Sequence, residues 1–141
     1  MEDYNLIENS EAVIDAFGYW PEFHDGEIHQ FILDNTDYNP SIDFILHGWE
    51  MTSEVDEKGY FKHQKNHLVH FHFEGIYDVN LEDFNHQNVI MALNIQELPK
   101  NEQGLSALLV EIDPSFGLGA EFKAHKARVV SVTPCTENGK N

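Results

Sequence analysis

The chain has 141 residues, of which 41% are hydrophobic and 12% aromatic, enough to bury a single core. This composition excludes a disordered acidic tail, which would contain fewer aromatic and β-branched residues. Asp and Glu number 25 and Lys and Arg only 8, so the formal net charge is −17. A protein this acidic repels nucleic acid and anionic membranes, and it attracts basic partners.

The acidic charge is concentrated in the first part of the chain. Residues 1–60 contain 15 acidic side chains and a single basic one, Lys58, whereas residues 61–141 contain 10 acidic and 7 basic side chains. An excess of acid is also what solubility alone requires. Its uneven distribution favours a dedicated binding face for a basic partner.

The ends of the chain and its single cysteine indicate the compartment. The N-terminus has no basic region leading into an apolar run, so we expect no signal peptide. No stretch approaches the roughly 18 apolar residues of a membrane span. Cys135 is the only cysteine and cannot form an internal disulfide, which fits a reducing compartment. We therefore expect a cytoplasmic protein.

A short N-terminal helix is predicted at residues 11–17, capped by Asn9 or Ser10 and ended by Gly18. From residue 27 onward, apolar and polar residues alternate, which is typical of antiparallel strands with one buried and one wetter face. The strands are expected at 27–34, 42–51, 60–61 with 68–74, 77–81, 89–95, 107–112, 121–123 and 128–132.

The connections complete the predicted fold. A tight turn at 56–59, where Gly59 supplies the positive φ, would join two long strands from about Ile42 to Val55 and from Gly59 to Glu74. Further loops are expected at 35–40, 99–104 and 113–119. The fold class is α+β: a mostly antiparallel sheet of seven or eight strands with one short N-terminal helix. We expect one domain over residues 1–134 and a polar tail, 135–141, that frays.

Histidines and carboxylates recur at a spacing that would suit a metal site. His70 and His72 would point to the same side of one strand, and Glu27 and His29 to one side of another. If the two strands met, the group would suit zinc or iron and would support a metal-dependent enzyme, with residues His24, Asp25, Glu27, His70 and His72. Histidines on a half-solvated strand face give the same pattern. We therefore expect no metal and no other cofactor.

The pattern of nucleophiles gives no support to catalysis. Cys135 lies in a polar segment, and a predicted strand separates it from His125. The serines lack the Gly-x-Ser-x-Gly context of a nucleophile elbow. Gly117-Leu118-Gly119 is too short for a phosphate-binding loop and precedes no helix. We expect no catalytic residues.

Acidic residues next to aromatic ones form the candidate partner-binding surface. Segment 19–28, between the helix and the first strand, is dense in both kinds of side chain. Its aromatic residues would either anchor a basic partner or plug the core, with Asp25 bonding backbone amides. The acidic turn at 56–59 and its flanks offer a second surface. The expected partner-binding residues are Trp20, Glu22, Asp25, Glu27, Glu50, Glu54, Asp56 and Glu57.

Six short motifs follow one another along the chain. They are Trp20-Pro21-x-Phe23-His24-Asp25-x-Glu27-Ile28, His47-Gly48-Trp49-Glu50, Phe73-Glu74-Gly75-Ile76, Phe84-Asn85-x-Gln87-Asn88-Val89-Ile90, Phe116-Gly117-Leu118-Gly119-x-x-Phe122 and Val130-Ser131-Val132-x-Pro134. Each motif is weak by itself. Their order and spacing, from about Phe17 to Pro134, resemble the bacterial immunity protein 50 family of polymorphic toxin systems.

The resemblance implies a non-catalytic immunity protein that binds and neutralises a toxin encoded beside it. It brings no catalytic residues with it. The charge agrees with this role, because an acidic inhibitor suits the basic site of a nuclease, and a basic toxin is the expected partner. Two alternatives stay open: the metal-dependent enzyme, and a general protein-interaction domain without a toxin partner. A homodimer is also open, because Ile28 and Ile32 lie on one strand face and Phe31 and Leu33 on the other.

Overall fold

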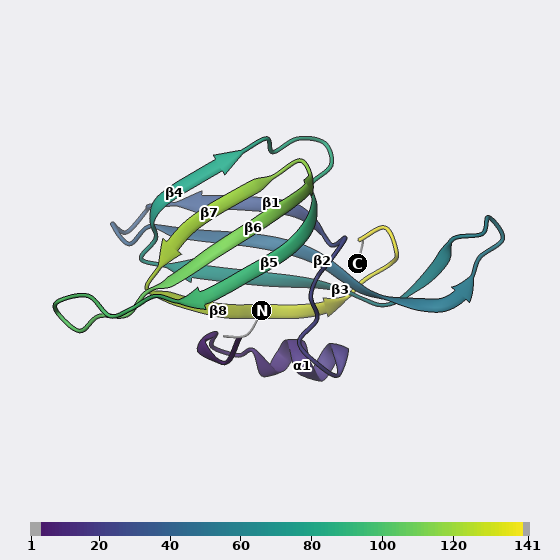
Figure 1. The fold of residues 1–141 in the computed structure, drawn as a ribbon, viewed down its shortest axis with the longest axis horizontal. Helices are drawn as coiled ribbons and strands as arrows, with labels where there is room; N and C mark the ends of the chain where they lie inside the picture. Colours follow the sequence, from purple (N-terminus) through teal and green to yellow (C-terminus); the bar gives the residue numbers. More distant parts are fainter. Residues whose placement is uncertain (1–3, 140–141) are drawn as a thin grey trace.

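The computed structural model describes residues 4–139, except the side chains of Phe61 and His63 (Figure 1). It contains a short 3-10 helix (η1, Tyr4–Leu6), one α-helix (α1, Glu11–Phe17) and eight strands. The strands are β1 (Glu27–Asp34), β2 (Ser41–Val55), β3 (Phe61–Glu74), β4 (Tyr77–Glu82), β5 (Val89–Glu97), β6 (Leu108–Phe116), β7 (Gly119–Ala124) and β8 (Lys126–Pro134). The predicted α+β class, with a mostly antiparallel sheet and one short helix, is confirmed.

The helix α1 is only seven residues long and depends on its tertiary contacts. Ser10 occupies the N-cap position but its side chain makes no capping bond, and the Asn9 amide instead donates to the Val129 carbonyl at 2.9 Å. Gly18 ends the helix as predicted, with a φ of 88° and its N–H bonded to the Ile14 carbonyl. No helix within residues 4–139 has the length and apolar character needed to cross a bilayer.

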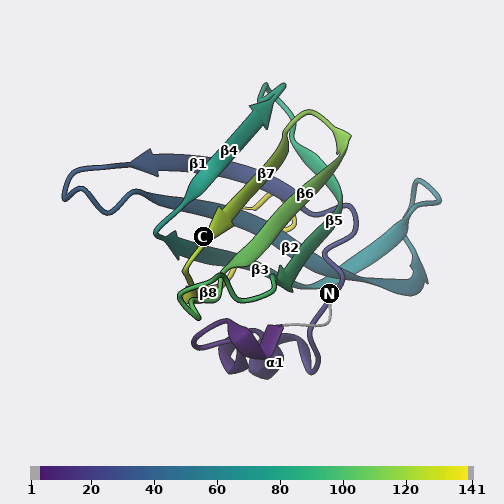
Figure 2. The ribbon, with the colours of Figure 1, turned by 60° about the vertical axis from the view of Figure 1, so that its left-hand side comes forward.

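All eight strands belong to a single sheet in the order β4-β7-β6-β5-β1-β2-β3-β8. The sheet folds over itself, so β4, β7, β6 and β5 face the other four strands as a second layer (Figure 2). The two layers are joined at one corner, where Glu27 of β1 pairs with Val89 of β5. Beyond this corner β1 and β5 separate, and the space between the layers is filled by the core.

The core consists of side chains from the facing sides of both layers. Phe44, Phe71 and Phe73 on β2 and β3 are fully buried, and the Phe73 ring meets the Phe122 ring of β7 edge-to-face at 5.1 Å. Edge-to-face geometry suits two aromatic quadrupoles and adds to the free energy gained from burial. These rings hold the two layers together where no strand pairing does.

The N-terminal segment covers the edge of the sheet at β8. Glu8 forms a parallel bridge with Arg128, and α1 packs against β3 and β8 (Figure 1). Phe17 is buried, and its ring contacts Phe23 and His67 at centroid distances of 6.1 and 5.2 Å. The helix therefore closes the space between the layers beside β8.

The connection predicted at 113–119 is shorter in the structure, because β6 continues to Phe116. Pro114, inside the predicted connection, pairs with Ile90 where the β5–β6 register shifts. On its other side, the pairing of β6 with β7 reaches only Ile112. A proline is tolerated at such a bulge, since no neighbour needs its missing N–H.

The tail after β8 is folded back as far as the structure describes it. The Cys135 N–H donates to the Asn66 carbonyl, and the Gly139 N–H donates to the Thr136 carbonyl. A side chain on Gly139 would overlap His29, so the tail runs closely over that ring. Our expectation of a frayed end therefore does not describe residues 135–139.

Candidate partner-binding surface

A long hairpin extends beyond the body of the protein (Figure 1). It is formed by residues 50–62, because β2 and β3 have 15 and 14 residues and outrun β1 and β8 with 8 and 9. Glu50 pairs with Gln64, and Val55 pairs with Phe61 next to the turn. Among the described residues, no other strand pairs with this ribbon, so both of its edges are free.

The tip of the hairpin is the turn that the sequence predicted. One carboxylate oxygen of Asp56 accepts the N–H groups of Lys58 and Tyr60 at 2.9 and 3.0 Å. Gly59 adopts a φ of 86°, and the Asp56 N–H donates to the Tyr60 carbonyl. Asp56 was predicted to bind a partner, and the structure gives it a second role in shaping the turn.

Apolar side chains on the hairpin are exposed among the acidic ones. Met51 and Val55 are more than half exposed, and Tyr60 is 69% exposed. Glu54 and Glu57 are exposed beside them. An exposed aromatic and two aliphatic side chains among carboxylates make the hairpin a candidate protein-binding surface.

Glu50 fixes the base of the hairpin to the body. Its carboxylate lies 3.1 Å from the Lys65 ammonium and accepts bonds from Gln64 and from the Tyr19 hydroxyl at 2.9 and 3.1 Å. The Lys65 ammonium also donates to the Phe17 carbonyl at the end of α1. The hydrogen bond from Lys65, followed by those from Gln64 and Tyr19, lowers the pKa of Glu50. Burial and the bond to Glu50 raise the pKa of Tyr19.

Trp20 is part of the core more than of the surface. Its indole is half-buried, stacks on the Tyr4 ring at 5.2 Å, and meets the Phe23 and Phe71 rings edge-to-face. Phe23 is buried with a φ of 59°, and the strand opposite approaches it closely, because a side chain on Gly48 would overlap its ring. The interpretation in which the aromatic residues of this segment plug the core therefore applies to Trp20 and Phe23.

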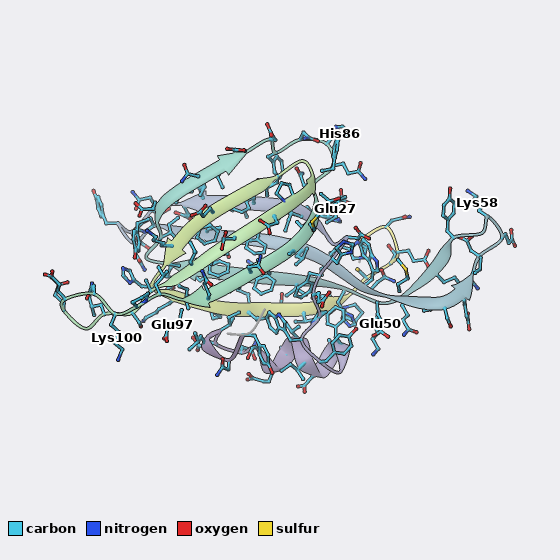
Figure 3. All side chains as sticks on the ribbon, in the orientation of Figure 1. Glu27, Glu50, Lys58, His86, Glu97 and Lys100 are labelled. Carbon is cyan, nitrogen blue, oxygen red and sulfur yellow. The ribbon has the colours of Figure 1, made fainter. Side chains whose placement is uncertain are left out.

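The other acidic residues of segment 19–27 point to solvent or to histidines. Glu22 is exposed and close enough to Tyr19 to raise the pKa of its hydroxyl. Asp25 lies 3.4 Å from His24, and Glu27 lies 3.7 Å from His29. Figure 3 shows Glu27, Glu50 and Lys58 toward the same end of the molecule, with Glu97 and Lys100 at the opposite end.

We define the hairpin end as the exposed carboxylates and apolar side chains at this end of the protein: Tyr19, Glu22, Met51, Glu54, Val55, Asp56, Glu57 and Tyr60. Not all N-terminal acids gather there. Asp34 and Asp37 follow the far end of β1, and Asp43 lies on the outer face of β2. Sequence reasoning named the acids but missed the four apolar or aromatic members, Tyr19, Met51, Val55 and Tyr60. The only signal for Met51, Val55 and Tyr60 was their position close to the predicted turn.

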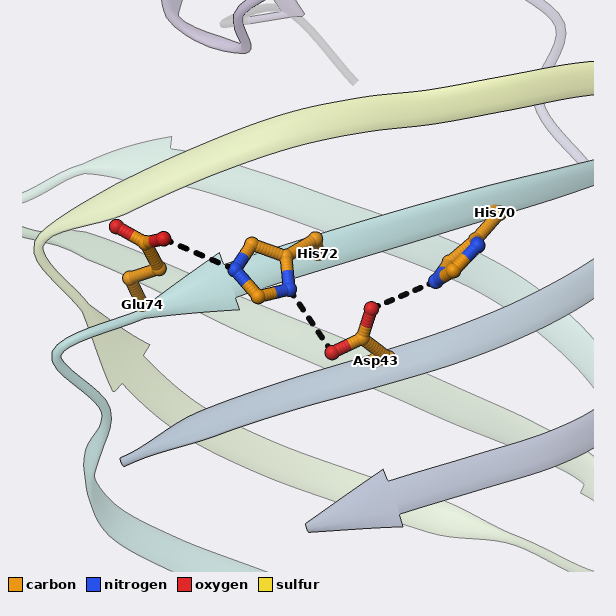
Figure 4. Close-up of polar contacts among 4 residues, drawn as sticks. All are labelled: Asp43, His70, His72 and Glu74. Atoms are coloured by element: carbon orange, nitrogen blue, oxygen red, sulfur yellow. Dashed lines mark hydrogen bonds and ion pairs between the residues drawn. The ribbon is translucent and has the colours of Figure 1, made fainter. Parts of the chain in front are cut away.

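The histidines of β3 form a polar chain with two carboxylates (Figure 4). His70 Nε2 and His72 Nδ1 lie 2.6 and 2.8 Å from the two oxygens of Asp43, and His72 Nε2 lies 3.1 Å from Glu74. Both nitrogens of His72 thus lie within hydrogen-bond distance of carboxylate oxygens. This chain stabilises the outer face of the sheet.

The histidine clusters considered as a metal site are not brought together. Glu27 and His29 lie near His47, whose ring is 5.7 Å from that of His29, whereas His70 pairs with Ile45 further along β2. Within residues 4–139, no three His, Cys, Asp or Glu side chains converge on one point as ligands would. The geometry gives the metal-dependent enzyme no support.

Cys135 and His125 are also separated. His125 precedes β8 and Cys135 follows it, so they lie at opposite ends of a nine-residue strand. The His125 ring stacks on Tyr77, and burial raises the pKa of the Cys135 thiol. A thiol with a raised pKa is a poor nucleophile at neutral pH.

The buried Asn88 joins two of the recognised motifs. The oxygen Oδ1 of its side chain accepts the backbone N–H groups of Asn85 and Leu118, both at 3.0 Å, and its side-chain Nδ2 donates to the backbone carbonyl of Asn85. The loop before β5 is thereby tied to the turn before β7 at Gly117, where the φ is 90°. These motif residues therefore have a structural role in the scaffold.

The family model of immunity protein 50 matches residues 9–135. The chain belongs to the immunity protein 50 family. The match spans α1 and all eight strands, and it leaves out η1 and the tail after residue 135. Comparison with curated proteins found no match, and comparison with solved structures found none. An immunity role follows from the family.

Proposed function

We propose that this protein binds and neutralises a bacterial toxin encoded beside it, without catalysis, and that the hairpin end is the docking surface. The observation that carries the proposal is the hairpin itself, which projects Tyr60, Met51 and Val55 into solvent among carboxylates. A protein gains nothing in stability by extending such a ribbon beyond its core. It gains reach into a cleft of another protein.

The charge of the chain supports a basic toxin as the partner. With a net charge of −17, the protein attracts a positively charged surface over distances near the Debye length, about 8–10 Å at physiological salt. Glu54 and Glu57 would meet that surface first because they lie at the most extended point of the fold. A nuclease, whose active site is basic because it holds phosphate, is the toxin class that this charge favours.

Rigid attachment of the hairpin supports the same role. Glu50, Lys65 and the Phe17 carbonyl form one bonded chain at its base, and Asp56 fixes the turn at its tip. A binding element that is ordered before binding loses less conformational entropy in the complex. The hairpin end is therefore suited to tight inhibition.

The test compares charge reversals at the hairpin end with charge reversals elsewhere on the protein. The double variant Glu54→Lys/Glu57→Lys changes the hairpin end and leaves the turn-forming Asp56 in place. The matched control, Glu102→Lys/Glu121→Lys, changes the same charge at two exposed positions, in the loop after β5 and on β7. Association rates with the purified toxin domain are measured at low and at physiological salt, together with growth of cells that express the toxin.

We expect the hairpin variant to associate about tenfold or more slowly and to protect cells poorly, while the control stays within about threefold of wild type. The difference should shrink at high salt, because exposed charges are then screened. Equal rates for the two double variants would rule out the hairpin end as the docking surface. Failure of the wild-type protein to bind the toxin at all would rule out the proposed function.

A further inference from the structure

An apolar groove lies between the two layers, away from the hairpin. Its walls are Phe31 and Leu33 of β1, Leu81 at the end of β4, and Phe84 and Leu118 from the loops. Its volume is about 300 Å³, room for several side chains. Leu33 and Phe84 are 56% and 54% exposed, although both line a concave apolar surface. A soluble protein normally fills or covers such a site.

The strand β1 borders this groove with an unpaired edge. Glu27 pairs with Val89 of β5, but from Gln30 to Asp34 the described strands pair with β1 only through β2. Figure 2 shows β4 crossing in front of β1 with a different direction, so it does not complete the pairing. The backbone N–H and C=O groups on the free side of residues 30–34 are therefore available to another strand.

The edge of β4 on the other side of the groove is less suited to pairing. Asp78 has a φ of 52°, and the register with β7 shifts between Tyr77 and Asn80. Such irregularities are a usual protection of edge strands. By contrast, residues 30–34 of β1 keep a continuous register with β2. Of the two edges, β1 offers the regular template.

We propose that an extended segment of the toxin adds to the free edge of β1 as a further strand and places alternate apolar side chains in the groove. This inference rests on the proposed function, because it takes the toxin as the partner. Strand addition supplies affinity through backbone hydrogen bonds, and the groove supplies specificity through every second side chain. The hairpin end and the groove would then be two contacts of one interface.

Charges around the groove identify the chemistry of that segment. Asp34 ends β1, Glu82 ends β4 and Asp83 follows it; Glu82 and Asp83 line the groove, and all three carboxylates are exposed. A segment that alternates apolar residues with Lys or Arg would satisfy both the groove and its rim. A second copy of this chain is disfavoured as the occupant, because it would bring another 17 negative charges toward the same rim.

The test uses the purified toxin domain and lysine substitutions at three exposed apolar positions. Leu33→Lys and Phe84→Lys place a positive charge in the groove. Val130→Lys is the matched control, because β8 is separated from β1 by β2 and β3 and its Val130 is also exposed. All three variants change the net charge equally, so a difference in toxin affinity between the groove variants and the control is caused by the position of the substitution. Thermal unfolding confirms that each variant is folded.

We expect Leu33→Lys and Phe84→Lys each to weaken toxin binding by about tenfold or more, and Val130→Lys by less than about threefold. Amide hydrogen exchange in the wild-type complex should slow at residues 30–34. Binding of the toxin with equal affinity to all three variants, and without protection of 30–34, would overturn this inference while leaving the proposed function intact. Light scattering that shows a dimer of the wild-type protein, lost in Leu33→Lys, would assign the edge to a second copy and also overturn it.

Discussion

The carboxylate of Glu50 lies 3.1 Å from the ammonium of Lys65, and this ion pair joins the base of the hairpin to the C-terminal end of α1. The two residues lie on adjacent strands, β2 and β3, at the point where the sheet leaves the body. Without this contact the hairpin would be connected to the body by strand pairing alone. The direction of the hairpin therefore depends on a surface ion pair with three further hydrogen bonds.

This contact predicts a pH-dependent stability. The pKa of Glu50 is lower in the folded protein than its usual value of 4.5, because Lys65, Gln64 and Tyr19 bond its charged form. Its stabilising contribution is thus fully present above the unfolded pKa and is lost as the pH falls through the folded pKa. We expect Glu50→Gln to lower the urea midpoint at pH 7 and to have a smaller effect as the pH falls below the unfolded pKa. If the difference in urea midpoint between wild type and Glu50→Gln were the same at every pH, the charged form of Glu50 would not be the source of the stabilisation.

The aromatic contact between the layers predicts a large loss of stability on truncation. Phe122 is fully buried and meets Phe73 at 5.1 Å, so Phe122→Ala removes a ring that bridges the two layers. We expect the free energy of unfolding to fall by about 3–5 kcal/mol, measured by urea denaturation. Phe116→Ala is the control, because Phe116 is half exposed, and it should cost less than about 1 kcal/mol. Similar losses for both variants would show that the layers are not joined by this ring.

Substitutions at two glycines with positive φ distinguish the stability cost of backbone strain from that of steric overlap. Gly117 and Gly104 have φ values of 90° and 77°. A side chain on Gly117 would overlap the Gln87 carbonyl, whereas a side chain on Gly104 would contact no neighbouring atom. Gly104→Ala should cost about 1 kcal/mol from strain alone. Gly117→Ala should cost at least twice as much, because the loop tied by Asn88 must also move. Chemical denaturation of both variants measures the difference, and equal costs would contradict the close contact.

The hairpin predicts one dominant aromatic contact with the toxin. Tyr60 and Tyr38 are 69% and 94% exposed, on the hairpin and on the β1–β2 loop respectively. We expect Tyr60→Ala to raise the Kd for the toxin by about 30-fold, as exposed aromatic anchors do, and Tyr38→Ala to change it less than about threefold. Isothermal titration calorimetry provides both values. A larger effect of Tyr38→Ala than of Tyr60→Ala would contradict the hairpin end as the main docking surface.

The local pattern of the sequence predicted the elements well, for a physical reason. Alternation such as Ile42, Phe44 and Leu46 reflects one buried strand face, and it was enough to place β2. Gly18 and the turn at Gly59 were equally clear, because few residues other than glycine adopt their backbone angles. The predicted end of β6 was too early, because Pro114 is a residue type that usually interrupts strands. Only the bulge opposite Ile90 shows why a proline is tolerated there.

The candidate surface was predicted only in part. Glu54 and Glu57 could be chosen from charge alone, but the same reasoning chose Glu50 and Trp20, which mainly support the structure. Charge and aromatic character indicate that a residue takes part in some contact. Whether the contact is internal depends on residues far away in the sequence, such as Lys65 for Glu50 and Tyr4 for Trp20.

The sequence by itself determined the acidic character, a mostly antiparallel sheet of seven or eight strands, the short helix and the family of this protein, because alternation, turn residues and ordered motifs are all local properties. Only the tertiary structure decided the strand order, the projection of the hairpin and the opening of the sheet beside β1. These depend on how the sheet folds over at Glu27 and Val89 and on how Phe73 meets Phe122. Packing between distant segments, which no local pattern encodes, therefore set which carboxylates and which strand edge are exposed.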